Sequence, residues 1–508
     1  MANRQKTKRK HGVGVSIRMI KGVILLSLTS TMTYAETTRE YFNSLKQNAS
    51  TFFAPKSNPD FNQANVHELS NFKVDTSAIP ELPMVSYGSS ITKNKNEKVQ
   101  QISFNDAIMR AVQRNPDISQ RIATLAAQNA NIDVAKSGYY PQLSGGLSTG
   151  DFTTGERGRQ LISLNASQLV YDFGKVKSEV SVEEAQLLVQ KANVLVSIDD
   201  IAYDAASAIV NIKRYQENSK IAEQQVSGIA RITEIANLRA NAGISSQADP
   251  VQAQSYLESA RANLIVQETQ LRQYQQKLRT LLGIDVSGLQ WTLPERLILE
   301  SNLYQEPEYN QVPRMMLARA EIDVAQKQLE QVRISNYPSI NLKGSVSQAV
   351  NGRNPNNNKD DGLYSAVMLE ASSNFYQGGA TASRTRAASY AEQSARARMN
   401  STYLSVLDQV RVLREEIENK QRKMGVLMAR KETAIRTKEL YQEQYKLGTR
   451  TVLDLLNAEQ SIHSAALEIE SARYDIFTAI VNYIAQTGRS RDLYDLKNIS
   501  IQGFEVQQ

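Results

Sequence analysis

The 508-residue sequence contains no cysteine and only three histidines. The lack of cysteine excludes disulfides, thiolate metal ligands, a cysteine nucleophile and a lipid anchor on an N-terminal cysteine. The histidines, His11, His67 and His463, lie far apart in the sequence, which disfavours a histidine metal site or catalytic dyad. We therefore expect no enzyme activity, no catalytic residues, no metal and no other cofactor.

Long apolar runs are also absent, and one short apolar segment follows a basic N-terminus. Seven Lys and Arg residues precede this segment, 22–28, and the small residues Thr33 and Ala35 stand before a candidate cleavage site. The pattern predicts a signal peptide over residues 1–35, the alternative being a cytoplasmic protein with a basic tail. Since no run of about 18 apolar residues follows, we expect no membrane-spanning helix. A soluble periplasmic protein and an outer-membrane β-barrel both remain open.

An excess of one charge sign is missing once the N-terminal segment is set aside. The formal net charge is +7, and residues 1–35 supply seven basic residues and no acidic one. The remaining chain has 52 basic and 52 acidic residues, which are interspersed. No basic footprint for phosphates is present, so we expect no nucleic-acid partner.

Two halves of the sequence can be superimposed. Pro141 in "GYYPQLSGGLS" matches Pro338 in "SNYPSINLKGS". Gly243 in "RANAGISSQADP" matches Gly448 in "YKLGTRTVLDLL", 205 residues further on. A repeat of about 200 residues is too long for a solenoid unit, so the pattern indicates an internally duplicated domain.

Each half changes its pattern in the same order: a helical segment ending at the proline, two stretches of period two, a long helix, a sharp turn and a returning helix. Period two is typical of strands with two different faces, either half-buried in a soluble domain or facing lipid on one side. In the second half, one face carries Ile340, Leu342 and Val346, and the other carries Asn341, Lys343, Ser345 and Ser347.

The long helices are predicted over Lys175–Ala242 and Ala380–Leu447, because neither segment contains proline. Gly228 and Gly425 are their only interior glycines. Each segment of 68 residues corresponds to roughly 100 Å of helix. Sevenfold spacing predicts coiled-coil packing, although Asp199 interrupts a second apolar row. The first row consists of Leu188, Leu195, Ala202 and Ile209.

The sharp turns contain capping signals as well as glycine. Glycine allows the positive φ that a helix needs to reverse direction. Thr451 with Asp454 is typical of a helix N-cap, and Ser246 with Asp249 fits the same interpretation. Arg450 lies in the turn, where we assign it no capping role.

Four strands per chain cannot close a barrel that contains a channel, whereas three chains would supply twelve. The predicted fold is therefore mostly α with a β-barrel portion, built from long coiled-coil hairpins and four strands per chain. An elongated periplasmic coiled-coil adaptor is the alternative, which the amphipathic strands disfavour.

Over roughly residues 100–490 the chain resembles the TolC-like outer-membrane channel-tunnel family. The resemblance rests on "GYYPQL", "LVYDFGK", "FYQGG", the duplication and "GTRTVLDLL". It implies a homotrimer whose twelve-stranded barrel lies in outer-membrane lipid and continues as a helical tunnel through the periplasm. It also implies a tapered tip that an inner-membrane ABC or other pump and a periplasmic adaptor, or membrane fusion protein, open.

The resemblance places a periplasmic gate at the tip turns, Gly243 and Gly448. Asp454 would line the entrance, and Tyr445 and Arg450 would tie the second hairpin to Asp249. Asn457 stands where some members of the family have a second acidic residue. The full set of implied gate residues is Asp249, Tyr445, Arg450, Asp454 and Asn457.

The remaining expectations concern domains and cargo. After the signal peptide we expect an extended or disordered segment at 36–98, a first repeat at 99–283 and a second at 311–488. Segments 284–310 and 489–508 would form an equatorial collar, as in the resembling family. The function implied is a type I secretion channel for unfolded protein, such as a large adhesin or an RTX-type protein. The alternative is the outer-membrane component of a drug or small-molecule efflux pump.

Overall fold

The fold is taken from a computed structural model of the chain. It describes residues 102–150, 159–351, 354, 356–357, 359–360, 362–497, 500–501 and 503–506. The predicted signal peptide at 1–35 and the predicted extended segment at 36–98 lie outside these residues.

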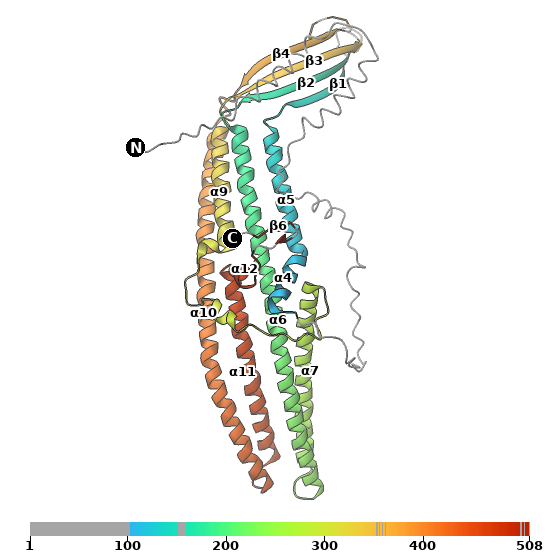
Figure 1. Cartoon of the computed structure of the whole chain (residues 1–508), viewed down its shortest axis with the longest axis vertical. Helices are drawn as coiled ribbons and strands as arrows, with labels where there is room; N and C mark the ends of the chain where they lie inside the picture. The colour runs from blue at the N-terminus through green and yellow to red at the C-terminus, as the bar shows by residue number, and fades with distance from the viewer. Residues whose placement is uncertain are drawn as a thin grey trace, which may run out of the picture. The chain divides into compact units, whose positions relative to one another are not determined.

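The described chain contains the expected duplication (Figure 1). The first repeat consists of α4 (Phe104–Arg114), α5 (Pro116–Ser137), β1 (Gln142–Gly150), β2 (Arg159–Tyr171), α6 (Lys175–Asn241) and α7 (Ala248–Leu282). The second consists of α9 (Pro313–Ile334), β3 (Ser339–Asn351), β4 (Leu363–Ser372), α10 (Ala380–Lys446) and α11 (Val452–Gln486). Shorter elements are α8 (Arg296–Glu300), the 3-10 turn η1 (Tyr309–Gln311), α12 (Ser490–Leu493), β5 (Ser500–Ile501) and β6 (Phe504–Glu505).

The two repeats have matching dimensions. The long helices α6 and α10 contain 67 residues each, and the returning helices α7 and α11 contain 35 each. The long helices end one residue before their predicted limits, which confirms the prediction made from the absence of proline. The fold is mostly helical, with a small antiparallel sheet, as expected.

The sequence pattern predicted one helical segment before the first strand, but the structure contains two helices there. The segment breaks at Asn115 into α4 and α5 because Pro116 has no N–H to donate within a helix. The side chain of Asn115 caps α5 by accepting a hydrogen bond from the Asp117 N–H, at 2.8 Å. Pro313 occupies the same first position in α9, so both repeats begin this helix in the same way.

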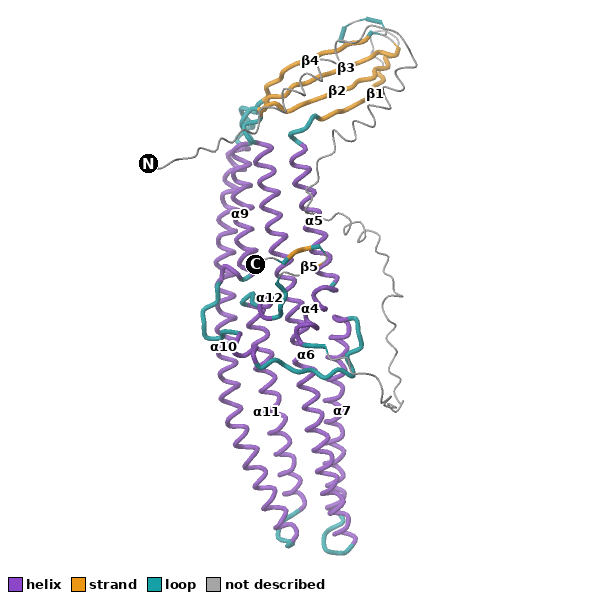
Figure 2. The backbone as a smooth tube through the Cα atoms, viewed as in Figure 1, coloured by secondary structure: helices purple, strands orange, loops and turns teal. Residues whose placement is uncertain are grey.

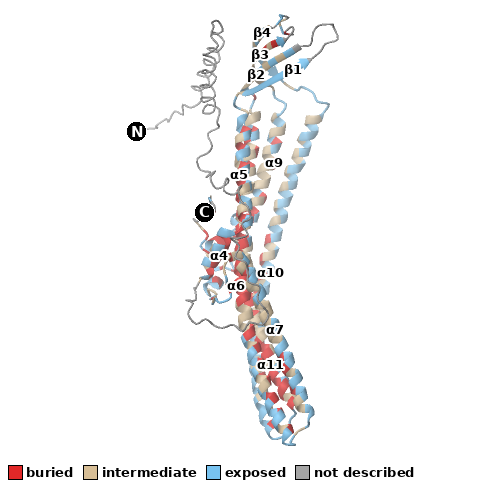
Figure 3. Cartoon of the chain, turned by 90° about the vertical axis from the view of Figure 1, so that its right-hand side faces the viewer, coloured by how far each residue is buried: buried red, intermediate tan, exposed pale blue. Residues whose placement is uncertain are grey.

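The helix α6 is central to the packing. It contacts α5, α7, α9 and α11, while α10 contacts only α9 and α11 extensively. Burial follows this difference, because α6 has many fully buried positions and α10 has few (Figure 3). The main core surrounds the middle of α6 and includes Trp291 from the segment between the repeats and Tyr494 from the C-terminal segment.

The four long strands form one antiparallel sheet in the order β1-β2-β3-β4 (Figure 2). The register pairs Leu143 with Ala166 and Leu164 with Val346. Since paired residues in adjacent strands share a face, most of the apolar side chains gather on one face of the sheet, with Leu161, Leu169 and Met368 among the exceptions. This face includes Leu143, Leu147, Ile162, Leu164, Leu342, Val346, Val367 and Leu369. The opposite face includes Ser144, Ser163, Asn165, Ser167, Asn341, Lys343, Ser345 and Glu370.

The apolar face is exposed in the single chain. Leu147, Val367 and Leu369 are each more than two-thirds exposed, and Leu143, Ile162 and Leu164 are about half exposed. A sheet with one water-exposed apolar face needs a further apolar phase or partner to cover it. Separately, none of the helices in the described ranges is both long and apolar enough to cross a membrane.

Candidate functional site at the hairpin turns

The turns of the two hairpins, α6–α7 and α10–α11, have the same backbone geometry. Gly243 and Gly448 adopt φ values of +71° and +76°. At the second turn, the Thr449 N–H donates to the Gln444 carbonyl at 3.0 Å, and the Gly448 N–H donates to the Tyr445 carbonyl at 3.1 Å. This pair of bonds is the Schellman motif, which needs a left-handed residue after the helix. The predicted role of both glycines as turn residues is therefore confirmed, and their place at a periplasmic tip stays a prediction.

The second turn continues into a capping box at the start of α11. The Asp454 N–H donates to Thr451 Oγ1 at 3.3 Å, and the Thr451 N–H donates to Asp454 Oδ2 at 3.4 Å. Thr451 and Asp454 thus satisfy each other's free backbone donors, which confirms the capping interpretation. The first turn differs: the N-cap of α7 is Gln247, with no side-chain cap bond, and Ser246 Oγ accepts only from the Ala248 N–H. The expectation that Ser246 and Asp249 form an equivalent cap was wrong.

Arg450 takes part in this local arrangement. Its guanidinium lies 3.7 Å from Asp454 Oδ2, donates from Nε to Gln444 Oε1 at 3.0 Å and covers the Tyr441 ring at 4.6 Å. Arg450 thus contacts the capping carboxylate but accepts no hydrogen bond from the backbone of α11, so the prediction that it has no capping role of its own is confirmed. Asp249 is not among the contacts of Arg450 within the described residues of one chain, so their pairing stays a prediction.

Tyr445 connects the second hairpin to the first. Its side chain is buried under the guanidinium of Arg239 on α6, 4.8 Å from the ring centroid. Burial raises the pKa of the Tyr445 hydroxyl, the charge of Arg239 opposes this, and the negative charge of Asp249 adds to it. The structure thus brings Tyr445 into electrostatic range of Asp249. Sequence reasoning missed Arg239, which occupies the position that Gln444 has in the second repeat.

Asn457 makes a second link between the hairpins. Its Oδ1 accepts a hydrogen bond of 2.9 Å from the Tyr256 hydroxyl on α7. Beneath these polar contacts, Ile232, Leu257 and Leu456 belong to a separate apolar cluster that joins α6, α7, α10 and α11. The two turns are therefore held together by a compact core near their ends.

A buried carboxylate lies next to this core. Glu459 on α11 is only 2% exposed. Its Oε2 contacts Lys438 Nζ on α10 at 2.5 Å, and its Oε1 contacts His463 Nε2 at 3.3 Å. Burial opposes ionisation, but the hydrogen bonds from His463 and Lys438 hold the pKa of Glu459 below its usual value. Gly228 of α6 faces this carboxylate, and a Cβ there would lie 1.9 Å from Oε1. The sequence shows Gly228 as an interior glycine of a long helix, but it does not show that Glu459 lies opposite.

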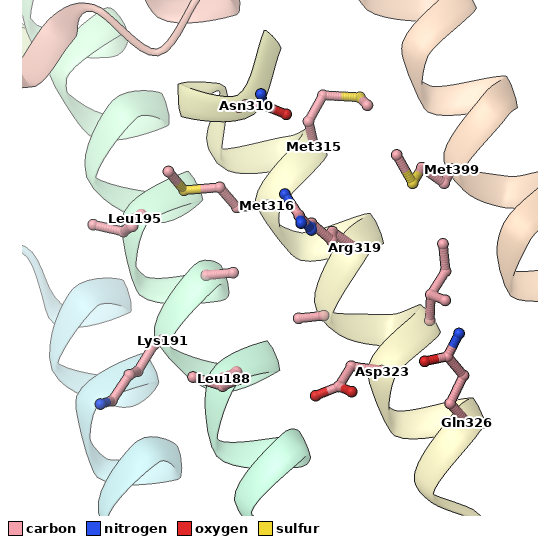
Figure 4. Close-up of a pocket in the computed structure, with 13 residues that line it drawn as sticks. Leu188, Lys191, Leu195, Asn310, Met315, Met316, Arg319, Asp323, Gln326 and Met399 are labelled. Atoms are coloured by element: carbon pink, nitrogen blue, oxygen red, sulfur yellow. The ribbon is translucent and has the colours of Figure 1, made fainter. Parts of the chain in front are cut away.

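A cavity of about 710 Å³ lies between α6 and α9, with Met399 contributed by α10 (Figure 4). Its lining combines aliphatic side chains and the thioethers of Met315 and Met316 with the charged groups of Arg319 and Asp323. The described residues contain no group of three or more His, Cys, Asp or Glu side chains that could hold a metal ion.

Each repeat of the chain combines one long helical hairpin with one β-hairpin that has a polar and an apolar face. Two such repeats in one chain are the architecture of a class of outer-membrane channel proteins. The chain belongs to the outer membrane efflux protein family, whose sequence profile matches residues 107–284 and 309–489. These two matches coincide with the two repeats, and the family places the protein in the outer membrane.

Individual relatives support this assignment. The outer membrane protein TolC of Vibrio cholerae is 24% identical over 388 residues, covering 73% of this chain and 87% of TolC. The alkaline protease secretion protein AprF of Pseudomonas aeruginosa is 27% identical over 168 residues, covering 33% of this chain and 34% of AprF. Among solved structures, the outer membrane protein VceC of Vibrio cholerae has a TM-score of 0.65 at 18% identity, covering 76% of this chain and 96% of VceC.

Proposed function

We propose that this protein is the outer-membrane channel of a type I secretion system. In this proposal a homotrimer exports unfolded protein and is coupled through a periplasmic adaptor to an inner-membrane pump. The observation that carries the proposal is the four-stranded sheet with one exposed apolar face and one polar face. Transmembrane barrels have this alternation, because one face meets lipid and the other meets a polar lumen.

The edges of the sheet support a trimer. Within the described residues, β1 and β4 each pair with one strand only, so each chain has two free edges. Free edges in a membrane leave backbone groups without partners, and pairing β4 of one chain with β1 of the next removes them. Three copies would close a barrel of about twelve strands.

The helices lead to the same assembly. Val412, Val426 and Leu440 of α10, with Leu447 directly after it, lie on one sevenfold row, in which Asn419 and Thr433 occupy the positions between them. Each of the four apolar side chains is more than half exposed in the single chain. A mainly apolar sevenfold row is typical of the contact surface of a coiled coil. We propose that a neighbouring chain covers this row in the trimer.

The remaining parts of the proposal concern the collar and the gate. Segments 284–310 and 489–508 would form the collar, supported by the hydrogen bond of 2.6 Å from Arg489 Nη1 to the Ser301 carbonyl. Repeats 99–283 and 311–488 would form the barrel and tunnel. The periplasmic gate would consist of Asp249, Tyr445, Arg450, Asp454 and Asn457.

The secretion role is favoured over small-molecule efflux by the similarity to AprF, a protein named for protease secretion. Efflux is the second candidate, because the family profile carries the description of efflux proteins. A periplasmic adaptor is disfavoured by the two-faced sheet. Deletion of the gene separates the first two candidates: we expect a secreted protein to disappear from the medium while sensitivity to small toxic compounds is unchanged. The reverse result would support efflux.

Assembly is tested on the purified protein. We expect cross-linking in detergent to give a trimer, the protein to fractionate with outer membranes, and the trimer to form channels in planar bilayers. Cross-linking that yields only monomers and dimers would refute the proposed architecture.

The charge of Asp454 gives a prediction that distinguishes a role in the proposed gate from a role in the helix cap alone. Asp454→Asn retains a side chain that can cap α11, so a purely capping role predicts little change in stability or ion selectivity. If three Asp454 carboxylates surround a narrow entrance, the variant should shift the reversal potential in a salt gradient away from cations. Asn457→Asp should shift it towards cations, more strongly at low ionic strength. No shift in either variant would remove Asp454 from the conduction path.

A further inference from the structure

The polar face of the sheet carries almost no charge. Among the residues of β1–β4 whose side chains the structure describes, only Lys343 and Glu370 are charged. Both lie on the polar face, where their neighbours are Ser and Asn side chains and Met368. Ser167 of β2 pairs directly with Lys343, and Asn165 pairs with Ser345, so the neighbours of this ion pair towards β2 are neutral.

Lys343 and Glu370 are neighbours across two strands. The register places Lys343 opposite Met368 and Glu370 opposite Asn341, so the two charged residues are diagonal to each other. Long side chains reach across this diagonal. Lys343 Nζ donates to Glu370 Oε1 at 2.6 Å, and both side chains remain about two-fifths exposed. The pair therefore stays in contact with whatever fills the space beside the polar face.

We propose that the Lys343–Glu370 ion pair keeps the lumen of the barrel section electrically neutral, so that this section does not select between cations and anions. This inference rests on the proposed function, in which the polar face lines the lumen of a trimer. The substrate class that suits such a lumen is an unfolded polypeptide with segments of both charge signs, because neither sign meets a barrier there.

The electric fields of the two charges in each ion pair largely cancel. Three ion pairs in the trimer place equal numbers of positive and negative charges on the lumen wall, each pair closely compensated. Removing one partner leaves three like charges around a channel whose lipid-embedded walls have a low dielectric constant. Rings of like charge in such a channel favour ions of the opposite sign. Selection by charge would then remain with the hairpin turns rather than the barrel.

A cross-strand ion pair could also act only on folding. Such pairs contribute roughly 0.2–1 kcal/mol to sheet stability. That role predicts a change in unfolding temperature for each single variant and no change in ion selectivity, so the two roles have different readouts.

The test uses the full-length trimer in planar bilayers with a potassium chloride gradient. Glu370→Gln should shift the reversal potential towards anions, and Lys343→Gln should shift it towards cations. The matched control is the double variant Lys343→Gln with Glu370→Gln, which restores neutrality and should return the wild-type value. Both shifts should increase as ionic strength falls.

Channels with wild-type reversal potentials in both single variants would overturn the inference and leave the proposed function intact. A double variant that stays shifted like one of the single variants would also overturn it. If the wild-type protein forms no channels, the proposed function fails instead. Either single variant suffices if the other does not assemble.

Discussion

At pH 8, Asp199→Asn is expected to stabilise the protein by up to about 4 kcal/mol, and the gain should disappear near pH 4. Asp199 lies in the middle of α6 and is only 4% exposed. Burial raises the pKa of its carboxyl from 3.8 to about 7, against the opposing effects of Arg491 and Ser490. Asn has a similar shape and never ionises, so it avoids the cost of a buried charge.

The sign of this pH dependence follows from whether the Asp199 carboxyl loses its proton at lower pH in the folded or in the unfolded chain. The unfolded chain ionises Asp199 near its ordinary pKa, whereas the folded chain keeps the proton until about pH 7. Below about pH 4 the wild type is therefore about as stable as the variant. As the pH rises through 7, the wild type becomes less stable than the variant. A shift of roughly three pKa units corresponds to about 4 kcal/mol.

The measurement is the unfolding midpoint of both proteins between pH 4 and pH 8. Asp200→Asn is the matched control, because Asp200 is exposed and pairs with Arg314 at 3.4 Å on the surface. Such exposed pairs contribute at most about 1 kcal/mol. A difference between wild type and Asp199→Asn that is constant with pH would contradict the assignment of Asp199 as the group responsible.

The same substitution at the two interior glycines is expected to have opposite effects. Gly228→Ala should destabilise the protein by about 2–4 kcal/mol, because its Cβ would lie 1.9 Å from Glu459 Oε1 and 3.0 Å from Cδ. The buried carboxylate would have to leave Lys438 and His463 to make room. Gly425→Ala, where nothing lies within 4 Å of the added carbon, should stabilise α10 by up to about 1 kcal/mol.

Thermal unfolding followed by circular dichroism compares the two alanine variants with the wild type. Because each variant makes the same chemical change inside a 67-residue helix, helix propensity cancels between them. Equal midpoints for the two variants would show that Glu459 does not require the space at position 228.

Features set by short-range chemistry could be predicted from the sequence. The ends of α6 and α10, the positive φ at Gly243 and Gly448 and the Thr451 cap each depend on residues within one helical turn. The break before Pro116 is of the same kind and could have been predicted, because proline cannot donate within a helix.

Contacts between helices could not be predicted, because they depend on which face each helix turns to its neighbours. The sevenfold row predicted a buried Leu188 and treated Asp199 as an interruption, yet Leu188 is about half exposed and Asp199 is buried. The neighbours of α6 change along its length, so its buried face changes too. The contact of Arg239 with Tyr445 and that of Tyr256 with Asn457 join residues about 200 positions apart, and no local pattern indicates them.

The unequal chemistry of the two turns has a consequence for how the tip would respond to force. At equivalent positions the first turn has Ala240 and Ser245, and the second has Tyr445 and Arg450. A ring of six nearly identical hairpins in the proposed trimer would therefore alternate between two kinds. A partner that pulls on this ring would act on three hairpins that carry these side chains and on three that do not. In the proposed trimer, duplication followed by divergence would therefore give the ring of turns threefold rather than sixfold symmetry, so that a partner would meet two different kinds of turn.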